Sequence, residues 1–149
     1  MKCGLDSFNL KNAEIVILGT FPGELSLCAK AYYSDTRNQF WRLLGLEYHD
    51  FNGLKKLNIG LWDVIESCER NGSLDKNIKN EKYNDMSLLK DKRIFFNGKK
   101  AYKYFLKAIQ EQHIDLIVSE KQILPSSSPA LPVSFEIKSQ QWNNILKRK

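Results

Sequence analysis

The sequence predicts an α/β fold: three layers, α/β/α, with a short, mostly parallel central sheet of about four strands. Two observations lead to this prediction. Short apolar runs rich in β-branched residues alternate with stretches of helical spacing, an order typical of a parallel sheet covered by helices on both faces. Three of these runs are followed by turn sequences, "GTFPG", "FNGK" and "LPSSSP". Because ligands bind beyond the carboxyl ends of parallel strands, we expect these turns to form one site.

The first elements follow from apolar spacing. A strand is expected over 15–18, where the run "IVIL" is continuously apolar and meets Gly19. The segment "RNQFWRLLG" has apolar residues at helical spacing and predicts a helix that stops at Gly45. A second strand is expected within 58–67, with loop character at Gly60.

The central part of the chain repeats the strand-turn-helix pattern. The polar stretch 68–92 predicts a loop that contains a short helix around 86–89. A strand is then expected over 93–96, followed by an Asn-Gly turn and a helix that runs to about Gln110.

The last part of the chain predicts one or two further strands and a closing helix. The strands are expected in "IDLIV", 114–118, and in "KQIL", 121–124, which leads into the Pro/Ser turn. Ser139 is a plausible N-terminal cap for the helix. The helix has one apolar face, formed by Trp142, Ile145 and Leu146.

The composition predicts one soluble domain. A chain of 149 residues with a hydrophobic fraction of 42% suits a single domain with one core, which we expect to extend over 1–149. No apolar run approaches the ~20 residues that a membrane-spanning helix needs. The first residues also lack the apolar segment of a secretory signal, so we expect a cytoplasmic protein.

The charge permits a phosphate-rich partner. The formal net charge is +6, from 23 Lys and Arg against 17 Asp and Glu. Such an excess fits nucleic acid without requiring it. Basic residues crowd one region of the sequence: Lys90, Lys92, Arg93, Lys99, Lys100, Lys103 and Lys107.

The cysteines do not indicate a metal centre. Cys3, Cys28 and Cys68 are far apart and odd in number, and no C-x-x-C occurs. We therefore expect three reduced thiols, no disulfide framework, no metal and no cofactor.

Five segments in order carry a resemblance to a known family. "GTFPG", "YYSDTRNQFW", "GLWDVIESCE", "FFNGKKAY" and "LPSSSPA" cover about residues 13–132 and resemble the uracil-DNA glycosylase superfamily. The sequence is most similar to its hypoxanthine-DNA glycosylase branch, which is related to the mismatch-specific uracil/thymine-DNA glycosylases. The resemblance implies an enzyme that flips a deaminated base, hypoxanthine or else uracil, out of double-stranded DNA. The enzyme then hydrolyses the N-glycosidic bond and leaves an abasic site. It further implies a metal-independent enzyme associated with the nucleoid, which we expect to be a monomer.

The resemblance also implies roles for individual residues. Asn38 takes the catalytic position, whereas mismatch-specific relatives carry a catalytic Asn where this chain has Phe21. Leu124 replaces a His or Asn of the superfamily, and Asp35-Thr36 replaces a His-Pro pair of the branch. The residues expected to bind the base, with Tyr33 stacking on it, are Gly19, Thr20, Phe21, Pro22, Gly23, Tyr33 and Asn97. Those expected to contact DNA phosphates are Pro125, Ser126, Ser127 and Ser128.

The chemistry leaves alternatives open. We hypothesise that the Asn38 carbonyl oxygen aims the attacking water, although Asn is also a preferred helix cap. Asp35 and Asp63 are rival water activators, because a carboxylate is a better base than an amide. For Asp63 we favour a cap or a loop hydrogen bond. No Lys is obviously placed to form a Schiff base, so hydrolysis without strand cleavage is expected.

Two other functions compete with base excision. One is a Ser-dependent hydrolase, which would need His49 or His113 as base, although no G-x-S-x-G motif occurs. The other is a nucleic-acid-binding module that has kept the fold and lost the chemistry.

Overall fold

A four-stranded parallel sheet forms the centre of the protein. The computed structural model describes residues 1–147. Its central sheet has the order β3-β2-β6-β7, and every neighbouring pair is parallel. The strands are β2 (Ile15–Gly19), β3 (Ile59–Asp63), β6 (Arg93–Asn97) and β7 (Ile123–Leu124). The predicted short, mostly parallel sheet is therefore confirmed.

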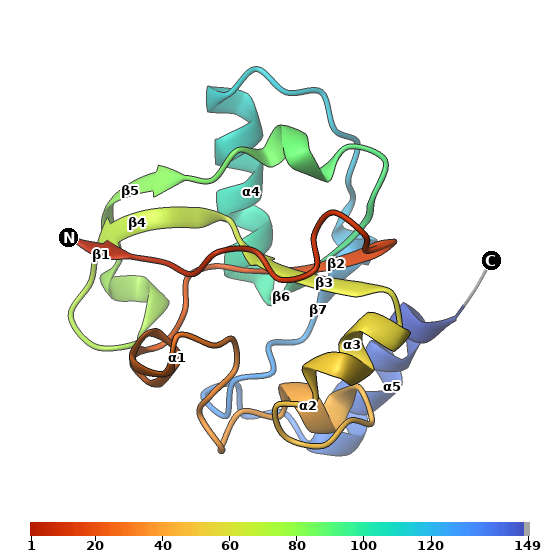
Figure 1. Ribbon diagram of the computed structural model, residues 1–149. Coiled ribbons are helices and arrows are strands. Elements are labelled where there is room, and N and C mark those ends of the chain that lie inside the picture. Colours follow the sequence, from red (N-terminus) through yellow and green to blue (C-terminus); the bar gives the residue numbers. More distant parts are fainter. Residues whose placement is uncertain (148–149) are drawn as a thin grey trace.

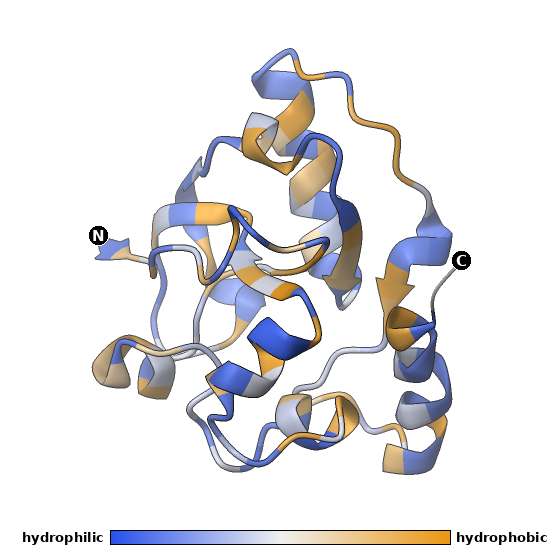
Figure 2. Ribbon diagram, turned by 45° about the vertical axis from the view of Figure 1, so that its right-hand side comes forward, coloured by the Kyte–Doolittle hydropathy of each residue, from blue (hydrophilic) through white to orange (hydrophobic). Residues whose placement is uncertain are grey.

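Helices cover both faces of this sheet, as Figure 1 shows. On one face lies α4 (Lys99–Glu111), and on the other lie α2 (Phe40–Leu43), α3 (Phe51–Lys56) and α5 (Phe135–Leu146). Side chains alternate along β2, so Ile17 packs in the α2 and α5 core while Val16 packs in the α4 core. Figure 2 shows the matching pattern, in which apolar and polar residues alternate around the helices.

A second, antiparallel sheet lies at the side of the first and was not predicted. Its order is β1-β4-β5, from β1 (Lys2–Cys3), β4 (Ile65–Glu69) and β5 (Lys79–Tyr83). The expected strand within 58–67 therefore divides at Val64, where the chain leaves the parallel sheet. β5 reads "KNEKY" and buries no side chain fully, so its sequence gives no apolar signal.

The remaining helical elements are short. They are α1 (Glu24–Ala29), η1 (Asp75–Asn77), η2 (Met86–Leu89) and η3 (Glu120–Gln122), the last three being 3₁₀ turns. The short helix expected around 86–89 is present as η2. No helix within residues 1–147 combines the length and apolar character needed to cross a membrane.

Two predictions near the C-terminus are wrong. The segment 114–118 forms no strand, and its side chains alternate between packing beside α4 and facing solvent, with Ile117 96% exposed. The alternation is the same as that of a strand with one buried face, but the segment pairs with no other strand. The last helix begins at Phe135 and is capped by Ser134, whose side chain accepts the Ile137 N–H, so Ser139 lies inside it.

Candidate active site

The last residues of the parallel strands form a row across the carboxyl edge of the sheet. Gly19 pairs with Asp63 of β3, and Asn97 of β6 pairs with Leu124 of β7. Because Leu18 pairs with Phe96, the next residues, Gly19 and Asn97, are neighbours too. We call Asp63, Gly19, Asn97 and Leu124 the strand-end row. Strand alternation directs its side chains to the α2 and α5 face of the sheet.

Asn97 connects this row to the serine loop, residues 125–128. Its Nδ2 donates to Ser127 Oγ at 2.9 Å and to Tyr33 Oη at 3.1 Å, and its Oδ1 accepts the Ser127 N–H at 2.9 Å. Ser127 is buried. Both amide donors of Asn97 are thus in use, and this side chain joins two of the three turns expected to meet, "FNGK" and "LPSSSP", to Tyr33.

The C-terminal helix holds the serine loop against the start of α2. The buried Lys138 of α5 donates from Nζ to Gln39 Oε1 at 2.8 Å and to Ser128 O at 3.1 Å. Trp142 Nε1 donates to the Pro125 carbonyl, and the Gln39 N–H donates to Ser127 O. Burial lowers the pKa of the Lys138 ammonium. The sequence reasoning missed Lys138, which stands one turn before Trp142 on the apolar face, because the helix was expected to begin after it.

The N-cap of α2 is Gln39, and the residue before it is Asn38. Its Oδ1 accepts the Phe40 N–H at 3.0 Å, and its own N–H donates to the Asp35 carbonyl. Asn38 is therefore not the N-cap of the helix, although its side chain accepts the N–H of the first helical residue. An amide oxygen has two acceptor positions, so this bond leaves one for a water molecule.

Tyr33 lies beside the strand-end row in a left-handed backbone conformation, with φ of 53°. Its ring stacks on Phe40 at a centroid distance of 3.8 Å and an angle of 8°. Its carbonyl accepts the Trp41 indole N–H. Burial, chiefly, raises the pKa of the Tyr33 hydroxyl. One face of the ring is covered by Phe40, so a stacked base would need the other face.

Arg70 stabilises the "GTFPG" turn through a hydrogen bond to its backbone. The buried guanidinium donates to the Pro22 carbonyl at 2.6 Å and lies 5.0 Å from the centre of the Phe21 ring. Phe21 itself packs in a small core with Ile65 and Ile78. The Phe21 ring is therefore a core side chain, and its backbone is the part that can serve a ligand.

The serine loop is shaped by its own hydroxyl groups. Ser126 Oγ accepts the Ser128 N–H, and Ser128 Oγ accepts the Ala130 N–H. Ser126 also lies close to the "FNGK" turn, since a Cβ on Gly98 would be 3.3 Å from Ser126 Cβ. Both hydroxyls act here as acceptors, so their own protons remain for a phosphate oxygen.

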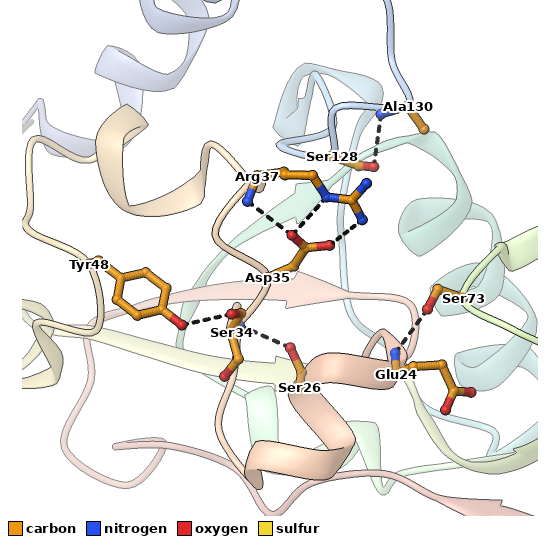
Figure 3. Close-up of polar contacts among 9 residues, drawn as sticks. All are labelled: Glu24, Ser26, Ser34, Asp35, Arg37, Tyr48, Ser73, Ser128 and Ala130. Atoms are coloured by element: carbon orange, nitrogen blue, oxygen red, sulfur yellow. Dashed lines mark hydrogen bonds and ion pairs between the residues drawn. The ribbon is translucent and has the colours of Figure 1, made fainter.

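Asp35 is occupied by an ion pair. Arg37 donates to its carboxylate from Nε at 3.1 Å and from Nη2 at 2.8 Å, as Figure 3 shows. The hydrogen bonds from Arg37 hold the pKa of Asp35 below its usual range. This geometry makes Asp35 a loop-stabilising group rather than a free base.

Asp63 has the opposite environment. The residue is 5% exposed, and its Oδ2 is buried without a hydrogen-bond partner among the described residues. Burial raises the pKa of Asp63 to about 7, the charge of Asp75 adds to this rise, and Arg70 opposes it. The cap or loop hydrogen bond expected for Asp63 is therefore wrong for Oδ2.

His49 and its serine neighbour do not form a hydrolase site. Ser34 Oγ lies 3.0 Å from His49 Nε2, but it donates its proton to the Ala31 carbonyl at 2.7 Å. A hydroxyl whose proton points elsewhere is not activated by the imidazole. Residues 1–147 also contain no group of three His, Cys, Asp or Glu side chains that could hold a metal ion.

An apolar cavity of about 710 Å³ lies elsewhere, between the N-terminal segment and the α1 region. Its lining includes Leu5, Phe8, Leu27 and Tyr32. None of the four residues of the strand-end row lines it, so the chemistry and this cavity are separate features.

Fold and candidate site together define an α/β protein with a cluster of polar groups at the carboxyl edge of a parallel sheet, the edge where such folds bind ligands. A profile of the uracil DNA glycosylase superfamily matches residues 5–145. The chain belongs to this superfamily, and it is a DNA glycosylase.

Relatives agree over nearly the whole chain. A hypoxanthine DNA glycosylase of Methanosarcina barkeri is 37% identical over 153 residues, which cover 93% of each chain. One of Methanosarcina acetivorans is 33% identical over 162 residues, which cover 99% of each chain. A solution NMR structure from M. acetivorans, assigned provisionally as a uracil DNA glycosylase, has a TM-score of 0.73 at 33% identity. The structural match covers 97% of this chain and 96% of the M. acetivorans chain.

Proposed function

We propose that the protein is a monofunctional glycosylase that removes hypoxanthine from double-stranded DNA, with uracil as the next candidate. The observation that carries this proposal is the junction at Asn97, which joins Tyr33, the "FNGK" turn and the serine loop beside the start of α2. Two relatives named as hypoxanthine DNA glycosylases support the choice of base. We expect the enzyme to act as a monomer and to leave the DNA strand intact.

In the proposed mechanism, a water oxygen forms a bond to C1′ of the deoxyribose while the bond from C1′ to the base nitrogen breaks. The bonding electrons leave with the base, which departs as an anion. Asn38 orients the water through the free acceptor position of Oδ1, and the proton of the water passes to solvent. Backbone N–H groups of Thr20 and Phe21 stabilise the departing base. Ser126 and Ser128 donate to the phosphates that flank the flipped nucleotide.

The Asn38→Ala variant tests this mechanism. It removes both the acceptor of the Phe40 N–H and the water-orienting oxygen, so we expect about 1 kcal/mol of lost stability and the loss of most excision. Duplexes with a single hypoxanthine, uracil, xanthine or ethenoadenine are incubated with the protein and then cleaved with alkali. Cleavage restricted to one lesion identifies the substrate.

The matched control is Asp50→Ala. Asp50 caps α3 by accepting the Gly53 N–H at 2.9 Å, and it lies outside the proposed site. We expect the same loss of stability with excision unchanged. If both variants excise alike, the Asn38 side chain only stabilises the start of α2. If the wild type shifts DNA in a gel without cleaving any duplex, the non-catalytic binding module is the correct function.

A further inference from the structure

Asp63 is the unused polar group of the strand-end row. Its Oδ1 lies 2.5 Å from the position that a Cβ on Gly19 would occupy, and Tyr33 Oη lies 3.5 Å from the same position. The carboxylate and the Tyr33 hydroxyl therefore both lie over Gly19, on the side to which its Cβ would point. The absence of a side chain at Gly19 is what leaves this space for it.

The other polar group of the row, Asn97, already has partners. Its Oδ1 accepts the Ser127 N–H, and its Nδ2 serves Ser127 and Tyr33. A base that enters without breaking this junction meets one buried, unpartnered side-chain oxygen in the row, Oδ2 of Asp63. A buried acceptor of this kind stabilises a ligand that donates to it and rejects one that cannot.

The ring edges of the candidate bases differ in the group that an acceptor detects. Hypoxanthine carries an N–H at N1 and uracil carries one at N3, whereas adenine and cytosine have a lone pair at the corresponding ring nitrogen. An ionised carboxylate accepts hydrogen bonds and cannot donate them. It therefore attracts the deaminated edge and repels the normal one.

We propose that the carboxylate of Asp63 selects deaminated bases by accepting the ring N–H that hypoxanthine and uracil carry. The proposal rests on the proposed function. The edge of the bound base reaches Asp63 over Gly19, beside the Tyr33 hydroxyl, so the Asn97 junction stays intact.

Position favours this role over activation of the water. Asn38, which orients the water, is tied to the β7 side of the sheet, because the next residue, Gln39, donates to Ser127 O. Asp63 ends β3, at the other edge of the four-stranded order. Asp75, Arg70 and the hydroxyls of Tyr32 and Tyr33 are the titratable groups around it. Burial, chiefly, and the charge of Asp75 favour the protonated carboxyl, whereas Arg70 favours the ionised, acceptor-only form, which prevails above about pH 7.

The test measures base preference in the Asp63→Asn variant. An Asn amide can present either its oxygen or its NH₂ group, so it can pair with either edge. Equilibrium binding is measured with duplexes that carry non-cleavable 2′-fluoroarabino analogues of deoxyinosine or deoxyadenosine opposite thymine. We expect the preference for the deoxyinosine duplex to fall about tenfold to a hundredfold from its wild-type value.

Two further variants make the result interpretable. Asp63→Ala removes the acceptor without offering a donor, so the preference should fall through weaker binding of deoxyinosine and through loss of the repulsion of deoxyadenosine. Asp115→Asn changes an exposed carboxylate in the segment after α4 and should keep the wild-type preference. The ratio of two affinities is measured in one preparation, so partial unfolding does not imitate the effect.

The outcomes separate this proposal from the proposed function. A wild type that excises no hypoxanthine overturns the proposed function. A wild type that excises hypoxanthine, with Asp63 variants that weaken both duplexes equally or keep the preference, shows that Asp63 has a structural role and overturns the specificity proposal. A loss of preference in both Asp63 variants supports it.

Discussion

Asp63 and Lys138 show how single buried groups support the site at a cost. Each has an ionisable group in the interior. Burial raises the pKa of the Asp63 carboxyl and lowers the pKa of the Lys138 ammonium, so it favours the neutral form of both. Lys138 has two acceptors for its protons, whereas Oδ2 of Asp63 has no donor. An unsatisfied buried carboxylate is expensive, and such groups concentrate at functional sites.

The Asp63 carboxylate predicts a pH-dependent stability. Because its pKa is raised to about 7, the folded state holds a proton that the unfolded state releases between about pH 4 and pH 7. This residue therefore destabilises the fold as pH rises through that window. Asp63→Asn stays neutral, so it should be near wild-type stability at pH 4 and more stable by roughly 2–4 kcal/mol at pH 8. Urea unfolding of both proteins across this range measures the free energy of unfolding as a function of pH. If the two proteins show the same pH dependence, Asp63 does not carry the buried charge.

Lys138→Met should loosen the serine loop. The change leaves Gln39 Oε1 and Ser128 O without their donor, which costs about 1–3 kcal/mol. We expect single-turnover excision to fall because the loop no longer rests firmly on α2. Lys103→Met, on the exposed face of α4, is the control and should keep the wild-type rate. Unchanged excision by Lys138→Met would show that the loop holds its position without α5.

At the scale of elements, the strand ends were predictable and their register was not. The apolar run before Gly19 and the "FFN" run were enough to predict two parallel strands whose ends meet. Register decides that Asp63 lies beside Gly19 and that its Oδ2 finds no partner, and register depends on packing across the sheet.

Elements without an apolar signal were missed for a physical reason. β5 is held by pairing with β4 and exposes most of its polar side chains. Segment 114–118 is the opposite case. Its residues alternate in burial like those of a strand, but it pairs with no neighbouring strand. Of the candidate site, the approach of Tyr33, Asn97 and the serine loop was expected from sequence. The supports from Lys138 and Arg70 were not, because they depend on where distant elements dock.

At the scale of the whole molecule, the basic residues divide between two edges of the sheet. Lys99 and Lys100 begin α4 beside Gly98, at the same edge as the strand-end row. Lys90 and Lys92 precede β6 at the other edge, where Lys92 bonds the Lys11 and Ala13 carbonyls. One crowded stretch of sequence therefore contributes to two surfaces.

This division predicts the salt dependence of DNA binding. Replacing Lys99 and Lys100 by Ala should weaken binding and reduce the slope of log affinity against log salt by up to about 1.8, which is the release of two counterions. The pair Lys11→Ala and Lys90→Ala removes the same charge from the opposite edge and should leave the slope unchanged. Fluorescence anisotropy over a salt series measures the affinity and the salt slope of both double variants. Equal slopes would show that DNA does not bind preferentially at the edge that carries Lys99 and Lys100.

The contacts of α5 have a consequence for biosynthesis. Lys138 and Trp142 clamp the serine loop, yet they belong to the helix that leaves the ribosome after every other element described here. Domains assemble as the chain emerges, so the parallel sheet can form while the clamp is still missing. We therefore expect the serine loop to become fixed only after the parallel sheet has formed, so a nascent chain with an assembled sheet should still lack the contacts that hold this loop.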